Sequence, residues 1–484
     1  MNRPPLFRIA RLTLLFLITL AAPTLTGCHA SKSRVETAHP SDETAFLDDL
    51  EERSFRWFWD VSDSSTGLTP DRWPTRSFQS IAATGFALTA YPIGVERGWI
   101  TRGQARRRVL DTLRFLWSAP QDSLSAGVIG YKGFFYHFLE PETGHRFQEV
   151  ELSTIDTALL LAGAFTCQSW FDQAVPEEME IRALTDSIYA RVDWQWASVR
   201  PPLIGHGWKP ESGHLGYDWR GYNEAMLVYL FALGSPTHPV VKEAWDGWIS
   251  GYRWGRFQEQ EHLGFAPLFG HQYSHVWIDF RGIKDDYIRE RGIDYFENSR
   301  RATLAQYAYA LANPGGFTGY GADLWGLTAC DGPVSGLFPV QGQPVQFNTY
   351  WARGATFDEI RDDGTISPTA AGGSIAFAPE IVIPVLMSMK RIYGENLYST
   401  YGFLDALNPT FRFETPVQHG RVIRGVGWFD TDYLGIDQGP ILTMVENYRT
   451  ELVWKAMRRN SHVRRGLKAA GFTGGWLDDA PAER

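Results

Sequence analysis

The chain has 484 residues, of which 44% are hydrophobic and 14% aromatic, and its formal net charge at pH 7 is −9. This composition allows a large core, and the acidic balance argues against nucleic acid as a partner, because nucleic-acid binding needs a basic surface. The 19 Trp residues are unusual for a plain helical core and suit the stacking of flat sugar faces, although the filling of a large core accounts for most of the aromatic residues. No linker divides the sequence after about residue 42, so we expect one domain over residues 43–475.

The N-terminus has the pattern of a targeting segment. A basic start precedes an apolar run from Leu12 to about Ala22, which is too short to span a bilayer. The run ends in LTGC, which resembles a bacterial lipobox, and on that resemblance Cys28 would be lipidated after cleavage. We therefore predict a signal peptide over residues 1–28 and a disordered polar tether over residues 29–42. The protein is expected in the cell envelope, on the periplasmic face of the outer membrane if the cell has one.

With Cys28 assigned to the anchor, only Cys167 and Cys330 remain. Cys167 lies in an apolar, helix-like run, which indicates a buried thiol. A disulfide between these two residues is one alternative in an oxidising compartment, and two unpaired thiols are the other. The cysteine spacing fits no metal site.

Beyond the tether, helices with a charged face alternate with helices that are almost wholly apolar. A helix that is apolar all round must be buried, so each apolar helix is expected inside a charged partner. About six such pairs predict an all-α fold, the (α/α)6 toroid, in which six outer helices surround six inner ones. The charged helices are expected over residues 43–60, 102–117, 176–192, 239–252 and 285–313, and the apolar ones over residues 80–95, 157–165, 224–233, 270–280, 381–389 and 441–445.

Acidic residues stand at the starts of several apolar helices. Because the inner helices of a toroid run in the same direction, their N-termini meet at one end of the barrel. Asp156, Glu224, Glu380 and Asp437 are therefore expected in one pocket, with Glu224 in the first turn of its helix. For any one of them, the simpler interpretation is an acid that complements the helix dipole. Ser153 followed by Asp156 also fits a variant of the capping box.

Six motifs carry a family resemblance: PIGVERGW from Pro92, STIDTALLLAG from Ser153, GYNEAM from Gly221, GHQYSHVWIDFRG from Gly270, WGLTACDGP from Trp325 and GIDQGP from Gly435. Over about residues 45–472 the chain resembles the bacterial glycoamylase-like family, which is allied to the endo-β-1,2-glucanases. The resemblance implies an (α/α)6 fold and a glycoside hydrolase acting on a glucose polymer. The family label suggests an α-glucan as substrate, whereas the alliance with the endo-β-1,2-glucanases suggests internal cleavage of β-1,2-glucan, which is the favoured reaction. Residues Val334–Arg361 look like a variable insertion near the barrel mouth.

Glycoside hydrolysis requires one carboxyl group that protonates the leaving oxygen and a second that activates water or attacks the anomeric carbon. We predict Glu224 as the general acid, because burial beside Tyr222 and Met226 would raise its pKa. Asp437 is predicted as the base, held ionised by N–H donors at a helix cap, and the two roles could be exchanged. Asp156 either orients water or substrate or only caps its helix. Toroid glycosidases usually invert, with carboxyls about 6.5–9.5 Å apart.

Other side chains are candidates for sugar contacts. His271 and His275 have the i, i+4 spacing of metal ligands on a helix, but HQYSH lacks the central Glu and no third ligand is evident. We therefore favour sugar contacts for both residues and expect neither a metal nor another cofactor. The remaining predicted substrate-binding residues are Asp71, Arg72, Trp208, Tyr222, Gln272 and Glu380, of which Asp71, Arg72 and Trp208 could equally have structural roles.

Two other classes of function stay open. A lipid-tethered glycan-binding protein on an inactive hydrolase fold would have lost the barrel acids, whereas Glu224 and Asp437 are present. A toroid polysaccharide lyase or sugar epimerase would need a basic pocket with a Tyr/His pair, whereas acids predominate here. The expected partners are a glucan or oligosaccharide and the membrane, and the protein is expected to be a monomer.

Overall fold

Long helices form the frame of the protein, and the computed structural model describes residues 40–479. The predicted signal peptide, Cys28 and most of the tether lie outside this range. Within it, no helix is both long and apolar enough to cross a membrane. The α-helices are α1 (Pro40–Val61), α2 (Ile81–Glu96), α3 (Arg102–Ser118), α4 (Thr154–Trp170), α5 (Pro176–Arg191), α6 (Trp194–Ala197), α7 (Met226–Leu233), α8 (Lys242–Ile249), α9 (Phe269–Trp277), α10 (Asp286–Glu290), α11 (Tyr295–Ala312), α12 (Pro368–Gly372), α13 (Pro379–Tyr393), α14 (Gly435–Thr450), α15 (Leu452–Arg459) and α16 (Ser461–Ala469), with 3-10 turns η1 (Gly394–Asn396) and η2 (Gly475–Leu477).

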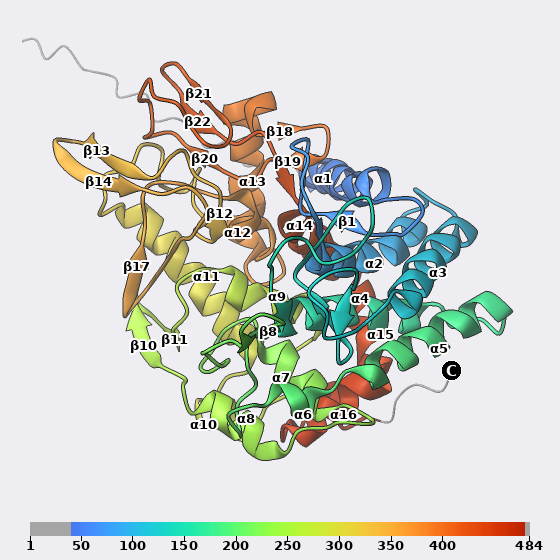
Figure 1. The fold of residues 1–484 in the computed structure, drawn as a ribbon. Helices are drawn as coiled ribbons and strands as arrows, with labels where there is room; N and C mark the ends of the chain where they lie inside the picture. The colour runs from blue at the N-terminus through green and yellow to red at the C-terminus, as the bar shows by residue number, and fades with distance from the viewer. Residues whose placement is uncertain (1–39, 480–484) are drawn as a thin grey trace, which may run out of the picture. The chain divides into compact units, whose positions relative to one another are not determined.

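The helices form two sets. In the first, α2 packs against α4 and α14, α4 against α7, and α14 against α9 and α12. The second set covers the first, with α1 on α2 and α14, α3 on α2, α5 on α4, α8 on α7, α11 on α9 and α13 on α12. Figure 1 shows α1 from the start of the chain beside α14 from its end. The predicted helix-rich architecture, with apolar helices inside charged ones, is confirmed.

The contact between α2 and α4 depends on glycine. A Cβ at Gly85 would lie 2.3 Å from the carbonyl oxygen of Leu159, and a Cβ at Gly163 would lie 2.0 Å from that of Gly85. The two backbones therefore touch where a side chain would hold them apart. This close approach fixes the first residues of α2 and α4 side by side, which matters for the site below.

The chain is not all-α, contrary to the prediction, because short strands connect the helices. Strands this short leave no clear alternation of apolar residues in the sequence, and several of them pair across long sequence separations. The strands are β1 (Thr69–Pro70), β2 (Arg72–Trp73), β3 (Gln79–Ser80), β4 (Gly130–Tyr131), β5 (Phe134–Tyr136), β6 (Phe138–Leu139), β7 (Leu152–Ser153), β8 (Gly207–Lys209), β9 (Gly213–His214), β10 (Trp254–Phe257), β11 (Gln260–Leu263), β12 (Ala329–Cys330), β13 (Gly336–Val340), β14 (Gln343–Phe347), β15 (Trp351–Ala352), β16 (Gly354–Thr356), β17 (Glu359–Arg361), β18 (Tyr398–Ser399), β19 (Gly402–Phe403), β20 (Leu407–Asn408), β21 (Arg421–Ile423), β22 (Gly427–Phe429) and β23 (Tyr433–Leu434).

Two pairings position the site. β4, β5, β7, β8 and β9 form one sheet that leads directly into α4, because β7 ends at Ser153 and α4 begins at Thr154. β2 pairs with β23 in antiparallel register, with Arg72 opposite Leu434. This ladder joins a loop near the N-terminus of the domain to the residues that precede α14.

The prediction of an inner helix beginning at Pro379 is wrong. The helix that packs against α14 in this part of the chain is the short α12, and Pro379 begins α13, which packs over α12 and buries only one face. Glu380 stands on the solvent side of α13 and pairs with Arg300 at 2.5 Å. Apolar content alone suggested burial here, although the basic last turn of α13 marks an amphipathic helix.

The two cysteines of the folded domain are buried and unpaired. The thiol of Cys167 donates to the carbonyl oxygen of Leu88 at 3.1 Å, and Cys330 contacts Arg353. Of the two alternatives from the sequence, the structure therefore shows free thiols. Burial raises the pKa of both thiols, which makes them poor nucleophiles.

Candidate active site

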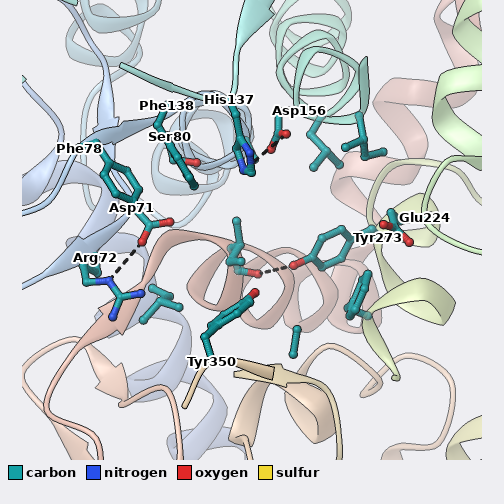
Figure 2. A pocket seen from close by; sticks show the side chains of 17 residues that line it. Asp71, Arg72, Phe78, Ser80, His137, Phe138, Asp156, Glu224, Tyr273 and Tyr350 are labelled. Carbon is teal, nitrogen blue, oxygen red and sulfur yellow. Dashed lines mark hydrogen bonds and ion pairs between the residues drawn. The ribbon is translucent and has the colours of Figure 1, made fainter. Parts of the chain in front are cut away.

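A cavity of about 440 Å³ lies where the first residues of α2, α4, α9 and α14 and the turn before α7 meet (Figure 2). Its volume is within the range of small-ligand sites. The meeting of inner-helix N-termini in one pocket is the arrangement predicted from the sequence. The lining residues are Asp71, Arg72, Phe78, Ser80, Ala82, His137, Phe138, Ile155, Asp156, Leu159, Glu224, Phe269, Tyr273, Ala329, Tyr350, Leu434 and Ile436.

Glu224 lines the cavity from a turn that precedes α7, rather than from the first turn of the helix as predicted. The side chain of Asn223 accepts a hydrogen bond from the backbone N–H of Ala225 at 3.0 Å, which closes a local turn before the helix begins at Met226. Oε2 of Glu224 is buried and has no hydrogen-bond partner among the described residues. Burial raises the pKa of Glu224 to about 7, and the charge of Asp156 adds to the shift. A carboxyl that holds its proton near neutral pH is suited to general acid catalysis.

Asp156 lines the cavity at the start of α4 and is held from two sides. The hydroxyl of Ser153 caps the helix by accepting from the N–H of Asp156 at 3.2 Å, and it also donates to the Asp156 carboxylate. Nε2 of His137 lies 3.6 Å from Oδ2 of Asp156 (Figure 2). The helix cap is therefore Ser153, and the Asp156 carboxylate accepts from its hydroxyl and lies in the wall of the cavity.

His137 is a lining residue that the sequence analysis missed. Its Nδ1 lies 2.9 Å from Oε1 of Glu151 and its Nε2 faces Asp156. Burial alone would lower the pKa of His137, but the carboxylates of Asp156 and Glu151 outweigh it and raise this pKa to about 9. The hydrogen bond with His137 lowers the pKa of Glu151 to about 2. The cavity therefore carries an imidazolium between two carboxylates at neutral pH.

The position and surroundings of Asp437 differ from those predicted. This residue is 4% exposed and is not among the cavity-lining residues, although its neighbour Ile436 is. The N-cap of α14 is Leu434, and Oδ2 of Asp437 is without a partner among residues 40–479. Burial raises the pKa of Asp437 to about 7, partly offset by a hydrogen bond with Asp405 and increased by the charges of Asp331 and other acids. The predicted stabilisation of the charged form by helix N–H groups is thus wrong.

The acids around Asp437 come from distant segments. Carboxylate oxygens of Asp331, Asp405 and Asp430 lie within 4.8 Å of one another and are fully buried. A cation would suit such oxygen ligands, but Nη1 of Arg72 donates to Oδ2 of Asp331 at 2.6 Å and supplies positive charge at this place. Burial raises the pKa of Asp405 and of Asp430 well above the ordinary range, so protons also neutralise the group. We assign no metal to it.

Asp71 and Arg72 line the cavity, as predicted, on the side opposite Glu224 in Figure 2. Arg72 Nε lies 3.2 Å from Oδ2 of Asp71, so Arg72 bridges Asp71 and Asp331. Burial raises the pKa of Asp71, and the guanidinium opposes that shift. The pairing of β2 with β23 holds this bridge against the start of α14.

His271, Gln272 and His275 lie behind the cavity wall and do not line it, contrary to the prediction of sugar contacts. Each of these side chains is buried and hydrogen-bonded within the protein. His271 bonds with a backbone carbonyl at 3.2 Å, Gln272 donates to Ser374 at 2.8 Å, and His275 bonds with Ser299 at 3.0 Å. Burial lowers the pKa of both histidines, to about 3 for His275, so both are neutral. The i, i+4 spacing of His271 and His275 therefore places both side chains in the packed interior.

Three further predicted contacts are also absent from the lining. Tyr222 is buried and packs on His271, with ring centroids 4.9 Å apart. Trp208 stands on β8 and packs against Trp196 at 5.8 Å. Glu380 is on the outer helix α13, away from the cavity. Tyr222 and Trp208 pack within the protein, and aromatic residues are conspicuous in a sequence whether they face a core or a ligand.

Tyr273 and Tyr350 line the cavity and were also missed. Tyr273 stands two residues after His271, about 200° around the helix, so it faces the cavity when the histidines face the core. Its hydroxyl donates to the carbonyl oxygen of Ile436 at 3.2 Å, which joins α9 to the first turn of α14. Tyr350 comes from the predicted insertion over residues 334–361, and its place in the wall depends on the hairpins that carry it.

Comparisons with known proteins identify the family of this chain. The glycoamylase family model, described as "Putative glucoamylase", matches residues 216–461. A curated relative from Parabacteroides distasonis, named exo beta-1,2-glucooligosaccharide sophorohydrolase (non-reducing end), is 28% identical over 93% of this chain. The chain spans only 61% of the length of that relative.

Solved structures cover the whole domain. A structure from Bacteroides uniformis, described as a "putative glucoamylase", has 30% sequence identity and a TM-score of 0.76, covering 90% of this chain and 99% of that one. An endo-beta-1,2-glucanase from Chitinophaga pinensis, solved with sophorotriose and glucose, has 26% identity and a TM-score of 0.75, covering 90% and 99%. The family match and the identity across nearly the full domain show that this chain belongs to the glycoamylase family.

Proposed function

We propose that this protein is a glycoside hydrolase that cleaves β-1,2-glucan, attacking internal linkages by an inverting acid/base mechanism. The observation that carries the proposal is a sugar-sized cavity with a carboxyl of raised pKa, Glu224, and further carboxylates across from it. The names of the Parabacteroides distasonis and Chitinophaga pinensis relatives support β-1,2-glucan as the substrate. One of these relatives is named as an exo-acting enzyme and the other as an endo-acting one, so the products must decide the mode.

Glu224 is proposed as the general acid, which transfers its proton to the oxygen of the scissile linkage. Asp437 is proposed as the base, which accepts a proton from the water that attacks the anomeric carbon from the other face. Because Asp437 does not line the cavity, this proton passes through an intervening water or sugar hydroxyl. Tyr273 lines the cavity and its pKa is raised by burial and by the charge of Asp437, which supports the proximity of the base to the site.

Asp156 is proposed to orient substrate or water together with His137. At neutral pH this pair offers a charged N–H and carboxylate oxygens, which are strong hydrogen-bonding partners for sugar hydroxyls. Asp71 and Arg72 are proposed to do the same from the opposite side of the cavity. No step of this scheme needs a metal or another cofactor.

The fold is proposed to be an (α/α)6 toroid, with α2, α4, α7, α9, α12 and α14 as the inner ring. Six outer partners, α1, α3, α5, α8, α11 and α13, each packing on an inner helix, support this architecture. The protein is further proposed to be a monomer, anchored by a lipid on Cys28 in the cell envelope, where a glucan from outside the cytoplasm would reach it. The lipobox-like LTGC supports the anchor.

The alternatives make different predictions for one experiment. The domain is incubated separately with linear β-1,2-glucan and with starch, and soluble oligosaccharides are measured over time. A β-1,2-glucanase releases products from the first polymer only, and internal cleavage yields a range of lengths from the start. A glycan-binding protein would release none, and a lyase would give unsaturated products. The retained carboxyl groups at the cavity favour hydrolysis over both.

A further inference from the structure

A second cavity of about 580 Å³ borders the one described above. Arg72 and Phe78 line both cavities, so the two share part of a wall. Glu224 and Asp156 line only the first. The second cavity therefore lies beside the proposed chemistry without containing its groups, and a chain bound in one cavity is within reach of the other.

Aromatic rings lead from the first cavity into the second. Phe138 lines the first, Phe147 lines the second, and Phe78 lies between them, with ring centroids 3.9 Å from Phe138 and 5.0 Å from Phe147. Trp73 lines the second cavity and is 41% exposed, although it is a large apolar side chain. Flat apolar rings of this kind provide surfaces on which the apolar face of a sugar ring can stack.

The second cavity also offers a polar group without a protein partner. Oε1 of Gln79 is buried and has no hydrogen-bond partner among residues 40–479. A buried acceptor of this kind needs a donor from water or from a ligand. Sugar hydroxyl groups both donate and accept, so a glucosyl unit in this cavity would satisfy Gln79.

The loop that carries these residues is fixed in place. β1 pairs with β3, placing Pro70 opposite Gln79, and β2 pairs with β23, placing Trp73 opposite Tyr433. The backbone N–H of Thr75 donates to the Asp432 carboxylate at 2.9 Å. The Trp73 surface is therefore held before any ligand arrives, which lowers the entropic cost of binding there.

We propose that the second cavity is an accessory subsite, which binds further glucosyl units of the same β-1,2-glucan chain whose scissile linkage lies in the first cavity. Trp73 is the stacking platform, Gln79 is a hydroxyl-binding group, and Phe78 is the shared border. The inference rests on the proposed function and extends it to chain length: longer chains reach both cavities and bind better than short ones.

The test uses linear β-1,2-linked glucooligosaccharides of increasing length and measures kcat/KM for each. For the unaltered protein, kcat/KM is expected to rise with length until both cavities are filled. Trp73→Ala is expected to lower the ratio of kcat/KM for long over short substrates by about two- to twelvefold, the range of one aromatic contact. Trp73→Phe keeps a flat ring and should restore most of the ratio.

Trp117→Ala is the matched control, because Trp117 is 42% exposed on α3 and lines neither cavity. It should leave the length ratio unchanged, and thermal melting shows whether each variant is folded. An unchanged ratio in folded Trp73→Ala, with an unaltered protein that does cleave the glucan, would overturn the subsite and leave the proposed function standing. An unaltered protein inactive on every length would overturn both. A Trp73→Phe variant as impaired as Trp73→Ala would argue against stacking.

Discussion

Nε2 of His137 lies 3.6 Å from Oδ2 of Asp156 inside the cavity, although β6, β7 and a long loop separate the two residues in the chain. The contact with Asp156, together with the Glu151 carboxylate, raises the pKa of His137. It also makes the protonation of His137 a direct report on Asp156.

Asp156→Asn is therefore expected to lower the pKa of His137 below about 9, because one of the two carboxylates that raise it is removed. The loss of turnover should be smaller than for Glu224→Gln, since Asn still hydrogen-bonds to Ser153 and to sugar hydroxyls. An NMR titration of the imidazole and steady-state kinetics measure the two effects. A His137 pKa unmoved by the substitution would contradict the ion pair.

Glu224→Gln keeps the shape of the side chain and removes the transferable proton. General acid catalysis typically contributes about 10²–10⁴-fold, so we expect turnover of β-1,2-glucan to fall at least about a hundredfold. Turnover near that of the unaltered protein would mean that another residue is the general acid.

The same variant has a stability signature that depends on pH. The pKa of Glu224 is raised to about 7, so ionising it in the folded protein is unfavourable, and its contribution to stability, present below about pH 4.5, is lost as pH rises through 7. The amide that replaces the carboxyl cannot ionise. We therefore expect Glu224→Gln to gain melting temperature relative to the parent at pH 8 but not at pH 5. Equal differences at both pH values would refute the raised pKa.

Asp437→Asn tests the base. The reaction needs Asp437 ionised and Glu224 protonated, and both pKa values are about 7, so the parent rate should peak near neutral pH and fall on both sides. We expect Asp437→Asn to lose at least about a hundredfold and its residual rate to lack the acidic limb, whereas residual activity of Glu224→Gln lacks the alkaline limb. A residual profile of Asp437→Asn that kept the acidic limb would assign that limb to another carboxyl.

Hydrolysis is expected to continue in the presence of a chelator, because two carboxyl groups suffice for the chemistry. The measurement is the initial rate on β-1,2-glucan before and after dialysis against EDTA. Loss of activity that a specific divalent ion restores would contradict this expectation. It would point to the group of Asp331, Asp405 and Asp430 and not to His271 and His275, whose ring nitrogens bond within the protein.

Cys28→Ser tests the anchor. Without the thiol there is no attachment point for lipid, so the full-length protein should move from the membrane fraction to the soluble fraction. Fractionation followed by immunoblotting measures this, and Cys167→Ser, which alters a buried thiol in α4, is the control. Membrane attachment that survives Cys28→Ser would show that the lipobox resemblance misleads.

Much of the frame could be predicted from the sequence. The uncharged run of α2 predicts an inner helix, because a helical surface without polar groups is stable only when it is buried. The charged run of α3 predicts an outer helix. The same reasoning placed Asp156 and Glu224 at one pocket, since parallel inner helices bring their first turns together. It failed at Pro379, where a mostly apolar segment buries only one face.

The sequence by itself determined the alternation of helices, the family motifs, the targeting pattern and the carboxyl groups at the helix starts, because these depend on composition and local periodicity. Only the tertiary structure decided which side chains face the cavity. Whether Tyr273 or His271 faces it depends on the rotation of one helix, and the buried acids around Asp437 come together through pairings such as β2 with β23. His137 acquires its charge from Glu151 and Asp156 only once the strands and α4 are packed. These contacts join residues far apart in the chain, and local sequence carries no record of the distance between them.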